Sequence, residues 1–200
     1  MPGIDVIAWP ARGRYREARW RARIAAPTER AWLAQHPSPA WAGLQLWAAK
    51  EAAYKALAHH AQPQGAFSPT RLHIVPQGAG FAWHDQQQAR QGVGRWYWGA
   101  GYLLALALDR ATPWEALRWQ LVCQPGLTAP RRSAAGRALL LQLVRSWSVP
   151  SHAPWQLRLN SNGAPLVSMD HVPWRLPASL SHDGTWLAAA LTFDSHDASP

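Results

Sequence analysis

Three groups of polar side chains have the types and spacing of a site that handles phosphate and metal. Glu51 and Lys55 stand four positions apart in an alanine-rich segment, so they lie on one face of a helix. Asp5 is the single acid in the short apolar run that opens the chain, where an unpaired carboxylate would be costly. Ser181 and His182 end another apolar run. Hydroxyl, imidazole and backbone N–H groups in such a turn can hold a phosphate.

The two acids indicate a shared cation. Mg²⁺ takes one or two protein carboxylates together with water and substrate phosphate oxygens, and Asp5 and Glu51 offer that donor set. On spacing alone, Glu51 and Lys55 are more often a surface ion pair worth about 0.3–0.5 kcal/mol. The metal hypothesis therefore depends on Asp5 meeting Glu51 in space.

Hydrophobic periodicity predicts the elements that position these residues. Apolar positions at three- and four-residue spacing predict helices, and short apolar runs between turn residues predict strands. The first half of the chain then contains a strand at 3–9, a basic helix at 12–24, a short helix at 29–35 capped by Thr28, a long helix at 41–59 and strands at 71–75, 80–83, 95–98 and 102–108.

The second half repeats this outline after a candidate boundary at 109–113. It contains strands at 117–123, 155–159, 178–182 and 186–193, a helix at 132–147, a turn at 160–163 and a hairpin signal at Asp183-Gly184. We therefore predict an α+β fold of two similar subdomains, 1–112 and 113–200, related by a pseudo-twofold axis. Each is an antiparallel sheet packed on a long helix, with the active site in the cleft between them.

Composition limits the partners without selecting one. The 200 residues carry a net charge of +9, which favours a polyanionic partner, although a codon bias toward arginine would explain the charge equally well. Cys123 is the one cysteine, so a disulfide or cysteine zinc site within one chain is excluded. No secretory signal and no uncharged apolar stretch of about 18 residues is found, so a cytoplasmic protein is expected.

Four motifs together resemble the signatures of the phosphopantetheinyl transferases. The resemblance spans most of residues 3–193, and the combination is far more specific than Lys-Glu-Ala alone. The motifs are the strand Gly3-Ile4-Asp5, the helix Trp47-Ala48-Ala49-Lys50-Glu51-Ala52-Ala53-Tyr54-Lys55, the turn Asn160-Ser161-Asn162-Gly163-Ala164-Pro165 and the hairpin Ser179-Leu180-Ser181-His182.

The resemblance implies Mg²⁺-dependent transfer of 4′-phosphopantetheine from coenzyme A to a serine of an acyl or peptidyl carrier protein, releasing 3′,5′-ADP. Asp5 and Glu51 would bind the metal, Glu51 would take the serine proton, and Lys55 would neutralise the leaving group. The residues implied to bind coenzyme A are Ser181, His182, Lys50, Arg132 and Ser133 at its phosphates, and Gly163 near its adenine.

The motif order resembles the larger, pseudodimeric (surfactin-synthetase-activating) class with its two halves exchanged, as in a circular permutation. That class often has a second acid where Ile7 stands and a basic residue where Ala164 stands. These departures leave open a degenerate member that binds coenzyme A or carrier protein without turnover.

The resemblance predicts an acidic carrier protein as the partner. It would dock on the basic segment that contains Arg14, Arg16, Arg19 and Arg23; the alternative is that these arginines form only a solvated face. We expect a monomer that binds neither nucleic acid nor membrane. A basic nucleic-acid-binding module is the alternative from another class, because Arg95-Trp96-Tyr97-Trp98 mixes charge with aromatic rings.

Overall fold

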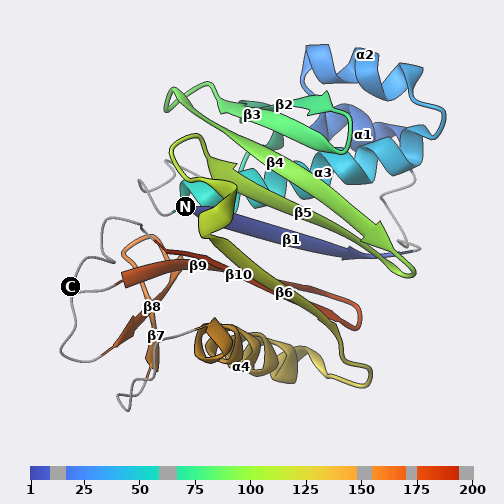
Figure 1. Cartoon of the computed structure of the whole chain (residues 1–200). Coiled ribbons are helices and arrows are strands. Elements are labelled where there is room, and N and C mark those ends of the chain that lie inside the picture. The colour runs from blue at the N-terminus through green and yellow to red at the C-terminus, as the bar shows by residue number, and fades with distance from the viewer. Residues whose placement is uncertain (10–16, 59–66, 148–154, 170–174, 194–200) are drawn as a thin grey trace.

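The chain folds into two antiparallel sheets with helices on their outer faces (Figure 1). The computed structural model describes residues 1–9, 17–58, 67–147, 155–169 and 175–193. Within these ranges it contains ten strands and four α-helices. No helix in the described ranges is both long and apolar enough to cross a membrane.

The first sheet has the strand order β1-β5-β4-β3-β2, and every neighbouring pair is antiparallel. The long helix α3 covers one face of this sheet and buries a core rich in alanine and leucine. The elements are β1 Pro2–Ala8, α1 Ala18–Ile24, α2 Pro27–Gln35, α3 Pro39–Leu57, the 3₁₀ helix η2 Pro69–Arg71, β2 Leu72–Gln77, β3 Gly80–Asp85, β4 Arg90–Gly99 and β5 Tyr102–Asp109.

The second sheet repeats this topology, with the order β6-β10-β9-β8-β7 and helix α4 on its outer face. The prediction of an α+β fold is confirmed, and two sheets of identical strand order are consistent with a pseudo-twofold relation. The elements are the 3₁₀ helix η3 Trp114–Ala116, β6 Leu117–Cys123, α4 Ala129–Trp147, β7 Trp155–Leu159, β8 Pro165–Met169, β9 Arg175–Asp183 and β10 Trp186–Thr192.

The inner faces of the two sheets pack against each other, which gives four layers from α3 to α4 (Figure 1). Ile4 and Val6 of β1 belong to the apolar core between the sheets, whereas Ile7 belongs to the core under α3. Because side chains alternate along a strand, Asp5 shares the α3 side with Ile7. Packing between the sheets thus directs the β1 acid toward the helix that carries Glu51 and Lys55.

Three features of the elements differ from the sequence-based prediction. Ala26, not Thr28, is the N-cap of α2, because the helix begins at Pro27 and the Glu29 carboxylate accepts the Ala26 N–H at 2.6 Å. The strand β8 was not predicted; it forms because residues after the Gly163 turn pair with both β7 and β9. The basic helix predicted at 12–24 begins only at Ala18, because Glu17 is an extended N-cap residue; residues 10–16 lie outside the described ranges.

Gly3 brings β1 into direct contact with the backbone of α3. A Cβ atom built at Gly3 would lie 1.8 Å from the Ala52 carbonyl oxygen, and backbone cannot yield as a flexible side chain does. We expect Gly3→Ala to lower the free energy of unfolding by about 2–3 kcal/mol.

Chemical denaturation checks this prediction against Gly136→Ala as a control. A Cβ at Gly136 meets no atom within 4 Å outside its own helix, and alanine is favoured there by up to about 1 kcal/mol. Equal stability of Gly3→Ala and the wild-type protein would contradict the close strand–helix contact.

Candidate functional site

A pocket of about 330 Å³ opens between the two halves of the chain. It contains six of the residues singled out from the sequence, together with Gly136 and Leu180, which sequence reasoning missed. The lining residues are Asp5 from β1, Lys55 from α3, Arg132, Ser133 and Gly136 from α4, and Leu180, Ser181 and His182 from β9. Residues more than 120 positions apart in the chain therefore share one pocket.

Asp5 is held at the edge of this pocket by two donors. Lys55 Nζ donates to Asp5 Oδ1 at 2.8 Å and to the Ile4 carbonyl oxygen at 2.9 Å. Ser181 Oγ donates to the same Oδ1 atom at 2.9 Å. The residue is only 8% exposed, so these contacts provide the partners that a buried carboxylate requires.

Glu51 is electrostatically linked to this pair, although its side chain is not part of the pocket lining. Burial, and after it the negative charge of Asp5, raise the pKa of Glu51 to about 7, while the positive charge of Lys55 opposes that rise. Such an effect requires the two carboxylates to lie near each other. The strand acid and the helix acid are thus electrostatically coupled, and their meeting at one cation remains a prediction.

The donor set fits a divalent cation with hard, oxygen-preferring chemistry. Two carboxylates that repel each other would be stabilised by a shared cation, and Asp5 lines a pocket with room for water and phosphate oxygens. Within the described ranges, no group of three or more His, Cys, Asp or Glu side chains could hold a metal ion. A cation shared by Asp5 and Glu51 would have few protein ligands, an arrangement that Mg²⁺ tolerates when water and phosphate oxygens complete its shell.

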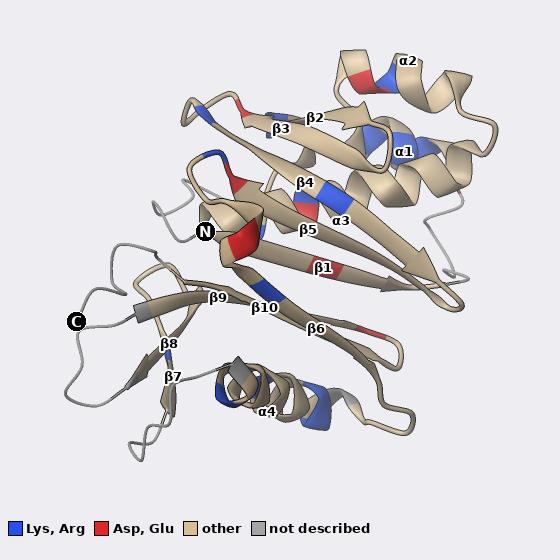
Figure 2. Ribbon diagram, in the orientation of Figure 1, with Lys and Arg blue, Asp and Glu red and all other residues tan. Residues whose placement is uncertain are grey.

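The opposite wall of the pocket is suited to anions. Arg132 and Ser133 lie in the first two turns of α4, where the positive end of the helix dipole favours negative charge. His182 is exposed at the end of β9. Figure 2 shows the basic residues on α4 and the acidic position on β1. A phosphorylated ligand in this pocket would therefore meet Arg132 and Ser133 of α4 as well as Lys55 and Asp5 of the first half.

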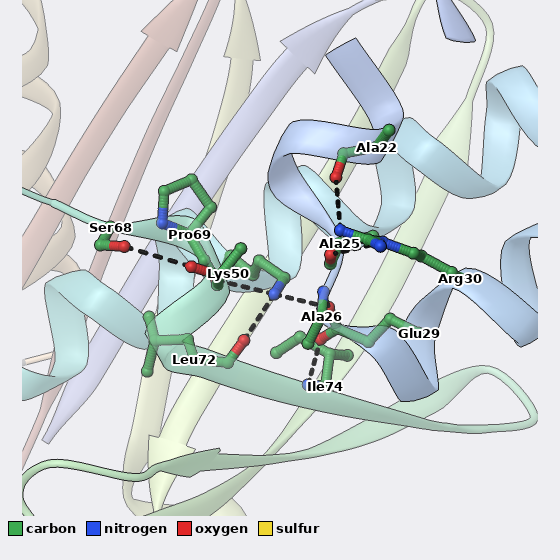
Figure 3. A network of polar contacts seen from close by, with 11 residues as sticks. Ala22, Ala25, Ala26, Glu29, Arg30, Lys50, Ser68, Pro69, Leu72 and Ile74 are labelled. Carbon is green, nitrogen blue, oxygen red and sulfur yellow. Dashed lines mark hydrogen bonds and ion pairs between the residues drawn. The ribbon is translucent and has the colours of Figure 1, made fainter. Parts of the chain in front are cut away.

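Lys50 does not belong to this pocket, which corrects the expectation that it contacts coenzyme A phosphates. Its fully buried ammonium pairs with Glu29 at 2.7 Å and donates to the Pro69 and Leu72 carbonyl oxygens (Figure 3). Lys50 and Lys55 are five positions apart in the helix, which corresponds to a rotation of about 140° around the axis. The two motif lysines therefore face different surroundings.

Gly163 lies in the exposed β7–β8 turn and does not line the pocket, so its proximity to adenine remains a prediction. The turn instead contacts the end of α3. The side-chain amides of Asn160 and Asn162 both donate to the Ala58 carbonyl oxygen, at 3.1 and 3.0 Å. This motif therefore joins the second half to the helix that carries Glu51 and Lys55, a role that the sequence did not indicate.

The corresponding position of the second sheet lacks an acid. Asp5 pairs with Ala105 and Gln120 pairs with Ala189, and both alanines are the fourth residue of the strand after a hairpin. Gln120 thus corresponds to Asp5 in the repeated topology. The two halves are alike in topology but differ in chemistry at this position.

Comparison with known protein families identifies the superfamily of this chain. A family model described as the 4′-phosphopantetheinyl transferase superfamily matches residues 1–107, which is more than half of the chain. The chain belongs to this superfamily. The matched region holds Asp5, Glu51 and Lys55, so the acids and the lysine of the site lie in the part that defines the family. A search of curated proteins finds no match.

Proposed function

We propose that this protein transfers the 4′-phosphopantetheine group of coenzyme A to a serine of an acyl or peptidyl carrier protein, with Mg²⁺, and releases 3′,5′-ADP. The observation that carries the proposal is the pocket in which Asp5 and Lys55 face Arg132, Ser133 and His182. A site that combines the Asp5 carboxylate with the cationic groups of Lys55 and Arg132 suits a phosphorylated substrate and a divalent cation. Membership of the superfamily supports the same reaction.

The chain's own residues account for the proton and the charge in this reaction. The serine oxygen bonds to the phosphorus that carries the pantetheine arm, and the bond from that phosphorus to the bridging oxygen breaks. Glu51 takes the serine proton as a general base. Lys55 neutralises negative charge on the departing 3′,5′-ADP. Bound Mg²⁺, held by Asp5 and Glu51, would neutralise the pyrophosphate.

The binding of both substrates follows from the charges around the pocket. Arg132, Ser133 and His182 hold the phosphates of coenzyme A, with support from the N-terminal turns of α4. The acidic carrier protein docks on the basic surface of α1, where Arg19 and Arg23 are exposed. Arg14 and Arg16, the other two predicted docking residues, lie outside the described ranges.

The proposal includes a pseudodimeric architecture with exchanged halves, 1–112 and 113–200, in a monomer. It is supported by the identical strand order of the two sheets and by the motif order along the chain. In this arrangement the Ser-His half follows the Gly-Ile-Asp half, as a circular permutation would produce.

The test is incubation of an apo carrier protein with coenzyme A and Mg²⁺, followed by mass spectrometry of the carrier. We expect a mass gain of one phosphopantetheine arm, which disappears in EDTA and in the Asp5→Asn variant. Binding of coenzyme A without a mass gain over a panel of fatty-acid, polyketide and peptide carriers would reject turnover. That result would select the degenerate alternative, for which the apolar Ile7, only 4% exposed, is the motivating observation.

A further inference from the structure

The outer edge of β1 is closed by side chains of β9 rather than by another strand. β1 pairs with β5 along one edge only, so its other edge presents N–H groups that need acceptors. Alternate residues of β9 provide them. The pairs are the Ile4 N–H with Ser179 Oγ at 3.1 Å, the Val6 N–H with Ser181 Oγ at 3.2 Å and the Ala8 N–H with Asp183 Oδ2 at 2.9 Å.

Among these three side-chain acceptors of β9, Ser181 makes one contact that Ser179 does not make. Its hydroxyl accepts the Val6 N–H and donates to Asp5 Oδ1, whereas Ser179 has no bond to an acidic side chain within the described ranges. A serine hydroxyl carries one hydrogen. While Ser181 gives this hydrogen to Asp5, it cannot also give it to a phosphate of coenzyme A.

Among the described residues, this row of side-chain acceptors is found along β1 but not at the corresponding edge of β6. Counted from the two hairpins, Arg95 and Tyr97 of β4 correspond to Ser179 and Ser181 of β9. Arg95 lies over the ring of Trp114 at 4.6 Å, and the Tyr97 ring packs on Trp119 at 5.0 Å. On the side where Asp5 lines the pocket, serine hydroxyls therefore stand at the positions whose counterparts in β4 contact aromatic rings.

We infer that Ser181 is a positioning residue that orients the Asp5 carboxylate for metal binding, an inference that rests on the proposed function. Ser181 from the second half and Lys55 from the first half both donate to Oδ1, which fixes the plane of the carboxylate. Among the described residues, Asp5 Oδ2 accepts no hydrogen bond, so this oxygen remains for a cation. The metal ligand on β1 thus takes its orientation from the other half of the chain.

The test compares Ser181→Ala with the matched control Ser179→Ala. Each variant removes one acceptor for a β1 N–H, but only the first removes the contact to Asp5. Mn²⁺ binding in the presence of coenzyme A is followed by the electron paramagnetic resonance signal of the free ion. Loss of a group that orients a metal ligand typically costs 10–100-fold in affinity, so we expect Ser181→Ala to bind Mn²⁺ about tenfold more weakly and Ser179→Ala to stay within about twofold of wild type.

Two further measurements separate orientation of Asp5 from other roles of Ser181. Ser181→Thr retains the hydroxyl and is expected to bind Mn²⁺ as the wild-type protein does. Calorimetric binding of coenzyme A in EDTA is expected to be unchanged in Ser181→Ala. A loss of metal-free coenzyme A affinity equal to the loss of Mn²⁺ affinity would show that Ser181 holds a phosphate and would overturn the inference.

The wild-type protein distinguishes failure of the inference from failure of the proposed function. Wild-type Mn²⁺ binding with an unchanged affinity in Ser181→Ala, or an equal loss in Ser179→Ala, overturns only the positioning role. Absence of Mn²⁺ binding to wild type with coenzyme A rejects the proposed function, and the inference falls with it.

Discussion

Glu51→Gln is expected to lower the rate of phosphopantetheine transfer by about 10³-fold or more while making the metal-free protein more stable at pH 8. The loss of rate follows from removing both the proton acceptor and a metal ligand. The gain in stability follows from burial and from the charge of Asp5, which raise the pKa of Glu51 from 4.5 to about 7. A neutral glutamine in this position carries no charge to desolvate.

The upward shift of the Glu51 pKa fixes the sign of the pH effect on stability. Between pH 4.5 and 7 the folded protein binds more protons at Glu51 than the unfolded chain does, so the contribution of Glu51 to stability falls as pH rises through this range. After allowance for its partial exposure, the ionised carboxylate costs about 1–2 kcal/mol at pH 8. Below pH 4.5 the wild-type protein and Glu51→Gln should differ little from this cause.

Denaturation in EDTA at pH 4.5 and pH 8 checks the predicted gain in stability, and the carrier assay checks the predicted loss of transfer rate. Glu115→Gln is the control, because Glu115 is exposed on η3 and lies outside the pocket. It should leave transfer and stability unchanged at both pH values. Retained transfer in Glu51→Gln, or lower stability than wild type at pH 8, would contradict the assigned role and environment of Glu51.

Local pattern predicted most of the elements because the strands and long helices are strongly periodic. The repeated helix-and-strand outline of the two halves was also visible, since Asp183-Gly184 and the segment at 109–113 interrupt the apolar runs. The strand β8 escaped because Pro165–Met169 is short and its pairing with β7 and β9 is not a local property. Boundaries and short strands therefore required the tertiary structure.

The partners of individual side chains were harder to predict than the motifs. The alternation of Ser179, Ser181 and Asp183 is readable in the sequence, but no local pattern says that β9 lies along the free edge of β1. Likewise, the Asn160 and Asn162 amides reach the end of α3, more than 100 residues away in the chain. Long-range hydrogen bonds of this kind depend on how the two halves pack together.

Lys50 illustrates the same limit within a single motif and leads to the largest expected effect on stability. Lys50→Met should lower the free energy of unfolding by about 3–5 kcal/mol, because it breaks a buried ion pair and leaves its partner charge in the core. The Lys50 ammonium has three acceptors in the Glu29 carboxylate and the Pro69 and Leu72 carbonyls. Without it, a carboxylate only 1% exposed keeps just the Ala26 and Ile74 N–H groups as donors.

Lys55→Met is the matched variant from the same helix. It should lose less stability than Lys50→Met, and its main defect should be in the rate of transfer. The Lys55 side chain is 28% exposed and Asp5 keeps Ser181 as a donor, so loss of Lys55 should cost about 1–2 kcal/mol of stability, less than loss of Lys50. Transfer should fall about 10²-fold or more, because charge on the leaving group goes unneutralised. Chemical denaturation and the carrier assay on both variants separate the two roles.

Adding Glu29→Gln to Lys50→Met should recover part of the lost stability, because the unpaired buried charge is then gone. Equal stability losses in the two lysine variants, or no recovery in the double variant, would refute this division between a structural and a catalytic lysine.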